Sequence, residues 1–96
     1  MPKAYLVAHI RVHDSATYEE FKKMSGPAIA DHGGRFLVRG SEADHREGSL
    51  RGRVIVIEFD DMEAARRFYE SDAYTAARGV RERAAETDLL LVEGVG

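Results

Sequence analysis

Cysteine is absent from the 96-residue chain, which excludes disulfide bonds, thiol nucleophiles and thiolate metal ligands. Long apolar runs are absent as well, since none approaches the roughly 18 residues that a membrane-spanning helix requires. No basic region followed by an apolar signal segment precedes the first predicted strand. We therefore expect a cytoplasmic protein without a membrane partner.

A concentration of positive charge is also missing. The 14 Lys and Arg residues are interspersed with 17 Asp and Glu residues, giving a formal net charge of −3. Nucleic-acid binding usually requires a basic patch or stripe, so we expect no nucleic-acid partner. The length predicts a single domain over residues 1–96. A chain this short buries only roughly 60 to 65% of its unfolded surface, so a partner subunit would add stability.

The most informative stretch is Val-Ile-Val-Ile-Glu-Phe at residues 54–59, in which β-branched residues dominate. Such a run predicts a central strand that is covered on both faces. Glu58 interrupts the run near its end. A carboxylate in that position must be paired, protonated or turned towards a cavity, and it is the first functional candidate.

The rest of the chain alternates between strand and helix patterns. Apolar periodicity predicts strands over residues 4–12, 35–40, 53–59 and 88–95, a helix ending near His32, and a second helix interrupted at Ser71 and Asp72. This order predicts an α+β, ferredoxin-like βαββαβ fold with a four-stranded antiparallel sheet in the order 4-1-3-2. We expect strands one and three to be parallel neighbours and both helices to cover one face.

The other face of this sheet predicts an oligomer. Apolar residues occupy both alternations of the third and fourth strands, so a monomer would expose a large apolar patch. We therefore expect a two-fold homodimer in which the sheet faces pack together and form a dimeric α/β barrel.

Local patterns refine three elements. Thr17 and Glu20 have the spacing of a capping box for the first helix. Pro27 lies inside that helix and predicts a kink or a restart nearby. In the second strand, simple alternation places Phe36 and Val38 on one face and Arg39 on the other. The polar residues 41–52 predict an exposed, mobile hairpin loop.

Four segments together carry a family resemblance. They are Gly33-Gly34-Arg35-Phe36-Leu37-Val38-Arg39-Gly40, Val54 to Phe59, Ser71-Asp72-Ala73-Tyr74 and Val92-Glu93-Gly94. In order and spacing they resemble the family called domain of unknown function 1330, within the dimeric α/β-barrel superfamily. The resemblance implies a homodimer of ferredoxin-like subunits. Relatives across that superfamily include cofactor-free monooxygenases, isomerases, dehydratases and haem enzymes, which usually employ a pocket between sheet and helices. The family itself has no assigned reaction, so the resemblance implies a pocket and no particular chemistry.

Glu58 and His9 are the catalytic candidates. A desolvated Glu58 would serve as a general acid or base. The alternative is an ion pair with Arg35 or Arg39. His9, on the neighbouring strand, suits proton transfer or haem ligation, and its alternative is a hydrogen-bonded structural histidine.

Arg39, Tyr74 and Arg81 are the ligand-binding candidates. Arg39 would hold a carboxylate through two hydrogen bonds, and Arg81 borders the apolar stripe of the last helix. For Arg81 the alternative is a solvated arginine. Tyr74 would supply an aromatic wall and a hydroxyl group.

These residues favour two functions, and haem or oxygen chemistry is a third hypothesis. The first is a small dimeric enzyme that performs acid/base chemistry on a small organic molecule, with carboxylated molecules among the candidates. The second is a dimer, non-catalytic or stress-related, that only binds a metabolite. No pair of histidines or carboxylates has metal-site spacing, so we expect no metal and no cofactor.

Overall fold

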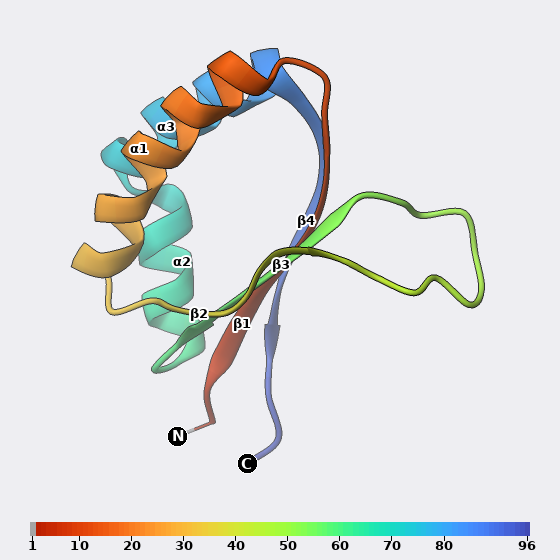
Figure 1. Cartoon of the computed structure of the whole chain (residues 1–96). Coiled ribbons are helices and arrows are strands. Elements are labelled where there is room, and N and C mark those ends of the chain that lie inside the picture. The colour runs from red at the N-terminus through yellow and green to blue at the C-terminus, as the bar shows by residue number, and fades with distance from the viewer. Residues whose placement is uncertain (1) are drawn as a thin grey trace.

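In the computed structural model, which describes residues 2–96, one four-stranded sheet carries all its helices on a single face (Figure 1). The elements are β1 Ala4–Val12, α1 Ser15–Asp31, β2 Arg35–Glu42, β3 Arg53–Phe59, α2 Met62–Glu70, α3 Asp72–Ala84 and β4 Ala85–Glu93. The predicted α+β, βαββαβ order is confirmed, with α2 and α3 as the two halves of the interrupted helix. The last strand begins and ends earlier than the sequence predicts.

The sheet has the order β2-β3-β1-β4, and all its neighbouring strands are antiparallel. This confirms the predicted order, whereas the expectation that β1 and β3 are parallel is wrong. Helix α1 crosses between β1 and β2, which makes those two strands parallel. The β2–β3 hairpin then inserts β3 between them, antiparallel to both.

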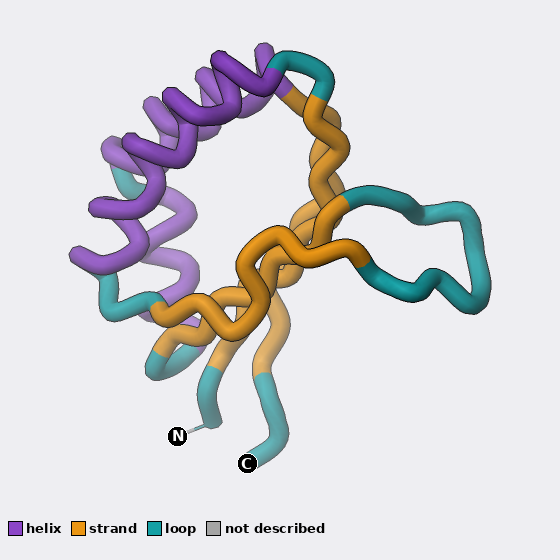
Figure 2. The backbone as a smooth tube through the Cα atoms, viewed as in Figure 1, coloured by secondary structure: helices purple, strands orange, loops and turns teal. Residues whose placement is uncertain are grey.

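The sheet is open and does not close into a barrel (Figure 2). Helices α1 and α3 lie beside each other on one side of it. The loop of residues 43–52 projects on the opposite side, away from the helices (Figure 1). Within residues 2–96 no helix has the length and apolar character that crossing a membrane demands.

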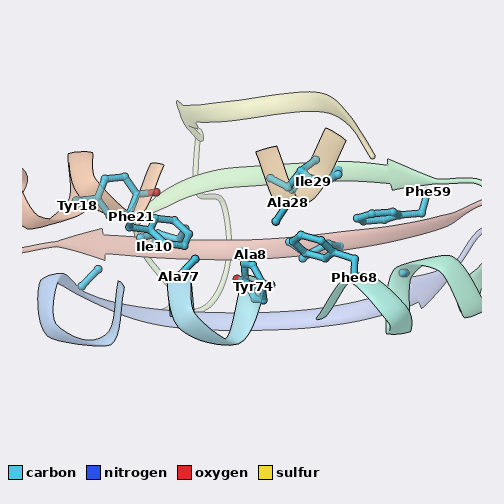
Figure 3. Packing of buried hydrophobic residues seen from close by; sticks show 14 of the residues in the cluster. Ala8, Ile10, Tyr18, Phe21, Ala28, Ile29, Phe59, Phe68, Tyr74 and Ala77 are labelled. Carbon is cyan, nitrogen blue, oxygen red and sulfur yellow. The ribbon is translucent and has the colours of Figure 1, made fainter. Parts of the chain in front are cut away.

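The core lies between the helices and the sheet (Figure 3). Its first strand follows the predicted alternation, because every second residue of β1 from Ala4 to Ile10 is buried. Phe59 and Phe68 are fully buried, with ring centroids 5.2 Å apart. These rings fix the position of the helices on the sheet through apolar contact.

Helix α1 differs from the sequence-based expectation in its N-cap and in continuing as one element past Pro27. Its N-cap is Asp14, whose carboxylate accepts the backbone N–H of Thr17 at 3.1 Å, so the cap precedes the expected one. The pKa of Asp14 is lowered by the hydrogen bond from the Thr17 hydroxyl and by this backbone hydrogen bond. Pro27 does not split the helix, which continues as one element to Asp31.

Strand β2 contains a β-bulge that changes which side chains share a face. Phe36 is opposite Ile57, but Val38 is opposite Val56, so Leu37 is one residue too many for simple alternation. A bulge of this kind shifts the side chains that follow it to the other face, here as far as a second register shift between Arg39 and Ser41. Arg39 therefore lies on the helix side with Phe36, and the predicted pairing of Phe36 with Val38 is wrong.

Gly34→Ala is expected to destabilise the protein by about 1–3 kcal/mol, because an added methyl group overpacks the core. Its Cβ would lie 2.7 Å from Ile29 Cγ2 and 3.0 Å from Phe59 Cε1. Chemical denaturation measures the effect. Gly79→Ala is the matched control, since nothing lies within 4 Å of its added Cβ. In the helix interior this change should stabilise by up to ~1 kcal/mol. Equal effects of the two changes would contradict this packing.

Candidate functional site

A cavity of about 390 Å³ lies between the sheet and helices α1 and α3. Its walls are mainly apolar and aromatic, with a few polar groups. The lining residues are Leu6, Ala8, Ile10, Tyr18, Phe21, Lys22, Ser25, Gly26, Ile29, Phe36, Arg39, Gly40, Arg53, Ile55, Ile57, Phe68, Tyr74, Arg81 and Leu89. This size and character are typical of small-molecule sites.

A second, more open depression of about 580 Å³ adjoins the cavity, and we call it the vestibule. It lies between the first turns of α1 and the base of the β2–β3 hairpin. The two hollows share Ile10, Tyr18, Lys22 and Arg53. The vestibule and the cavity are therefore neighbouring hollows bounded by the same four side chains.

Arg81 is the most unusual side chain of the cavity wall. It is only 5% exposed, although the sequence allowed a solvated arginine here, and that alternative is wrong. Its Nη1 donates a hydrogen bond to Tyr74 Oη, while its buried Nε–H has no acceptor. No carboxylate within residues 2–96 forms an ion pair with it at 4.0 Å or less. A buried guanidinium without an anion is unfavourable, because its lost hydration is not replaced.

Tyr74 holds Arg81 from the same helix, two turns earlier. It is 3% exposed, and burial raises the pKa of its hydroxyl, with the Arg81 cation opposing the rise. The hydroxyl is therefore neutral near pH 7. Since Oη accepts the Arg81 N–H, the tyrosine's own proton is free to be donated elsewhere.

Arg39 reaches the cavity because of the β2 bulge. Its guanidinium carbon lies 4.1 Å from the centroid of the Phe36 ring, in a cation–π contact. All three ligand-binding residues predicted from the sequence, Arg39, Tyr74 and Arg81, thus line one cavity. No Asp, Glu or His lines it within the described chain.

Glu58 lies on the opposite face of the sheet, which we call the outer face. Strand pairing places it between Tyr5 and Arg35. Its Oε1 accepts hydrogen bonds from Arg35 Nε at 3.1 Å and Nη2 at 3.0 Å, and Tyr5 Oη lies 3.3 Å from Oε2. The structure thus contains the ion pair with Arg35 that was the alternative for this residue.

His9 shares the outer face but lies far from Glu58. It is opposite Val54, and Glu58 lies four positions after Val54, a spacing of about 13 Å along a strand. Its nearest ring neighbour is His45, with centroids 6.3 Å apart. The two catalytic candidates are therefore not brought together, and neither lines the cavity.

Tyr18 and Arg53 also line the cavity, but neither was predicted from the sequence. Tyr18 is 8% exposed, and burial raises the pKa of its hydroxyl, with the cations of Arg81 and Arg53 opposing the rise. The helical spacing of Tyr18, Phe21 and Ser25 would have placed them on one buried stripe. Arg53 gave no such signal, because it is the polar first residue of an otherwise mainly apolar strand.

The outer face is partly apolar and carries no helix. By strand pairing it holds Tyr5, Val7, His9 and Arg11 of β1, Arg35 and Val38 of β2, Val54, Val56 and Glu58 of β3, and Glu86, Asp88, Leu90 and Val92 of β4. Leu90 is 54% exposed and Val92 44%. Residues 2–96 contain no group of three or more His, Cys, Asp or Glu side chains arranged to hold a metal ion.

The fold and the cavity define a ferredoxin-like α+β protein with an internal site between sheet and helices. Residues 3–95 match the family described as Domain of unknown function (DUF1330), and the chain belongs to that family. This confirms the resemblance found in the sequence. A comparison with curated protein sequences gives no significant match.

Solved structures share the fold at low sequence identity. A protein of unknown function from Rhodopseudomonas palustris has a TM-score of 0.80 and 16% identity, covering 99% of this chain and 84% of its own. SnoaB, a cofactor-independent oxygenase from Streptomyces nogalater, has a TM-score of 0.66 and 16% identity, covering 100% and 96%. A dimeric protein of unknown function and ferredoxin-like fold from Bacteroides fragilis has a TM-score of 0.64 and 12% identity, covering 96% of each chain. At these identities the likeness concerns the fold alone.

Proposed function

We propose that this protein binds a small organic acid in the cavity between sheet and helices, with the ligand's carboxylate at Arg81. The observation that carries the proposal is the burial of this guanidinium without a protein carboxylate. Removing a charged group from water costs several kcal/mol unless an opposite charge and hydrogen bonds replace the lost hydration. A ligand carboxylate would supply both.

The donors around Arg81 suit a carboxylate. Arginine binds carboxylates through two parallel N–H donors, and the Nε–H of Arg81 has no acceptor in the protein. The free proton of the Tyr74 hydroxyl adds a second kind of donor. The rings of Phe21 and Phe68 line the same cavity and would contact an apolar or aromatic ligand body.

Benzoate and benzamide are the probes that test this proposal, because they share shape but differ in charge. We expect calorimetric titration to detect benzoate binding and to show at least about tenfold weaker binding of benzamide, as a charge-assisted hydrogen bond is lost. Equal affinities, or binding of neither compound, would overturn the proposal.

Glu58→Gln is the control variant for this titration. Glu58 faces away from the cavity, so the variant should bind benzoate with wild-type affinity. Affinity should also be constant between about pH 6 and pH 8, since the arginine stays charged and both cavity tyrosines, with raised pKa values, stay neutral. A loss of affinity in Glu58→Gln, or an affinity that changes between pH 6 and pH 8, would contradict a binding site confined to the cavity.

The second part of the proposal is a homodimer formed through the outer face. Its apolar residues have no partner within the described chain, and Leu90 and Val92 remain substantially exposed. The structurally similar protein from Bacteroides fragilis is described as dimeric. In this dimer Glu58 and His9 would lie at or near the subunit interface.

An enzymatic role is the second candidate function, and Tyr74 favours it. A neutral hydroxyl that accepts a bond from a fixed cation retains a proton for a bound substrate, which is the arrangement of a general acid. The similar structure of SnoaB is that of an oxygenase described as cofactor-independent. If turnover of a carboxylated substrate is found, Tyr74→Phe should lower kcat more than it raises KM, whereas unchanged kcat would exclude this role.

A further inference from the structure

The charged side chains of the cavity wall are all basic, unlike those of the chain as a whole. The chain has more acidic than basic residues, yet the cavity is lined by Lys22, Arg39, Arg53 and Arg81 and by no acid within residues 2–96. Lys22 has a partner, since its Nζ lies 3.1 Å from Glu19. Within residues 2–96, no carboxylate forms an ion pair with any of the three arginines at 4.0 Å or less.

Arginines elsewhere in the sheet are paired. On the outer face, Arg11 contacts Asp88 at 2.8 Å and Arg35 contacts Glu58 at 3.0 Å. Within the sheet, the arginines of the outer face are therefore paired with carboxylates, whereas those of the cavity wall are not. Glu42 is opposite Arg53 in the sheet and lines the vestibule, but it forms no ion pair with Arg53.

The three arginines occupy two separate parts of the wall. Arg81 comes from α3 and is buried beside Tyr74. Arg39 and Arg53 come from adjacent strands on the opposite wall, and Arg53 also lines the vestibule. In the sheet Arg39 is opposite Ile55, two residues from Arg53, so these two arginines are diagonal neighbours.

Tyr18 lines both the cavity and the vestibule. Burial raises the pKa of its hydroxyl, and the nearby cations of Arg81 and Arg53 both oppose the rise. Figure 3 shows its ring among the buried side chains on the helix side of the sheet. Apolar side chains, among them Ile10 and Ile55, line the space between the charged parts.

We propose that the natural ligand is a dianion, an elongated molecule with an acidic group at each end and an apolar middle. One group contacts Arg81 and Tyr74, and the other contacts Arg39 and Arg53 near the vestibule. This inference rests on the proposed function, because it extends the same site from one acidic group to two. At each end of the ligand, an acidic group would lie beside arginines that form no ion pair within the described protein.

A series of unbranched dicarboxylates from succinate to azelate, each compared with its monomethyl ester, tests the second subsite. We expect calorimetric titration at low salt to show an affinity maximum at one chain length, where the diacid binds at least about fivefold more tightly than its monoester. The advantage should shrink as salt increases, because the second subsite is partly exposed.

Two variants and one control locate the effect. Arg53→Met and Arg39→Met should each reduce the ratio of diacid affinity to monoester affinity. Arg66→Met removes an exposed charge that lines neither hollow and should change nothing.

The outcomes separate this inference from the proposed function. A monoester that binds as tightly as the diacid at every length overturns the dianion and leaves the organic-acid site intact. If neither diacid nor monoester binds although benzoate does, the dianion is overturned; if benzoate does not bind either, the proposed function itself fails. If Arg66→Met has the same effect as Arg53→Met, the advantage arises from overall charge and the second subsite is refuted.

Discussion

Replacing Arg81 with methionine is expected to stabilise the unliganded protein and, at the same time, to abolish carboxylate binding. The wild-type protein buries a guanidinium whose Nε–H has no acceptor, and a buried unsatisfied polar group costs about 1–3 kcal/mol. Methionine fills a similar volume without a charge. Allowing for the lost hydrogen bond to Tyr74 and the cation–π contact with Phe21, we expect a net gain of about 1 kcal/mol.

The gain corresponds to a rise of about 4–8 °C in the thermal unfolding midpoint of a domain of this size. Benzoate affinity of Arg81→Met should fall by roughly 30-fold or more, as expected for removal of one member of a buried charged pair. Arg83→Met is the matched control, because this residue is exposed on the same helix and should change stability by less than about 0.5 kcal/mol. If Arg81→Met is clearly less stable than the wild type and still binds benzoate, Arg81 has a purely structural role.

Leu90→Lys is expected to convert the proposed homodimer into a monomer that remains folded. Leu90 is 54% exposed in the single chain and lies opposite Val7 on the outer face, so a lysine there meets water in the monomer. In a dimer built on this face the ammonium group would be buried between apolar side chains, at a cost of several kcal/mol. Sedimentation velocity measures the change in mass, and circular dichroism verifies the fold.

Val95→Lys is the control for this experiment. Val95 is an apolar residue beyond the end of β4 and is fully exposed, so a lysine there should leave association unchanged. If the wild type is a monomer at every concentration, or if Leu90→Lys remains dimeric, the outer face is not the interface.

The fold could be predicted from the sequence because most of its elements carry a local signal, which is a period, an apolar run or a polar break. Alternating apolar residues identified β1, the apolar run at 54–59 identified β3, and the polar break at Ser71 divided the last helix. The direction of β3 relative to β1 was mispredicted, although the hairpin insertion determines it. Pro27 was overestimated as a helix breaker, since α1 continues past it.

The site was harder to predict, because it depends on irregular backbone and on contacts between distant segments. A single bulge at Leu37 moves Arg39 to the helix side, which no alternation pattern can reveal. The burial of Arg81 depends on Phe21 from α1 and Tyr74 from α3, and pairing across the sheet connects Glu58 to Arg35. Residue type therefore selected three side chains that line one cavity, while tertiary structure separated them from Glu58 and His9.

The central claim is that a ligand carboxylate completes the coordination of Arg81. A crystal structure of the protein with benzoate is the most direct measurement. We expect one carboxylate within hydrogen-bond distance of the Arg81 guanidinium and the Tyr74 hydroxyl, with its ring among the apolar side chains of the cavity. Benzoate on the outer face beside Glu58 and His9, or an Arg81 guanidinium that gains no acceptor, would contradict it.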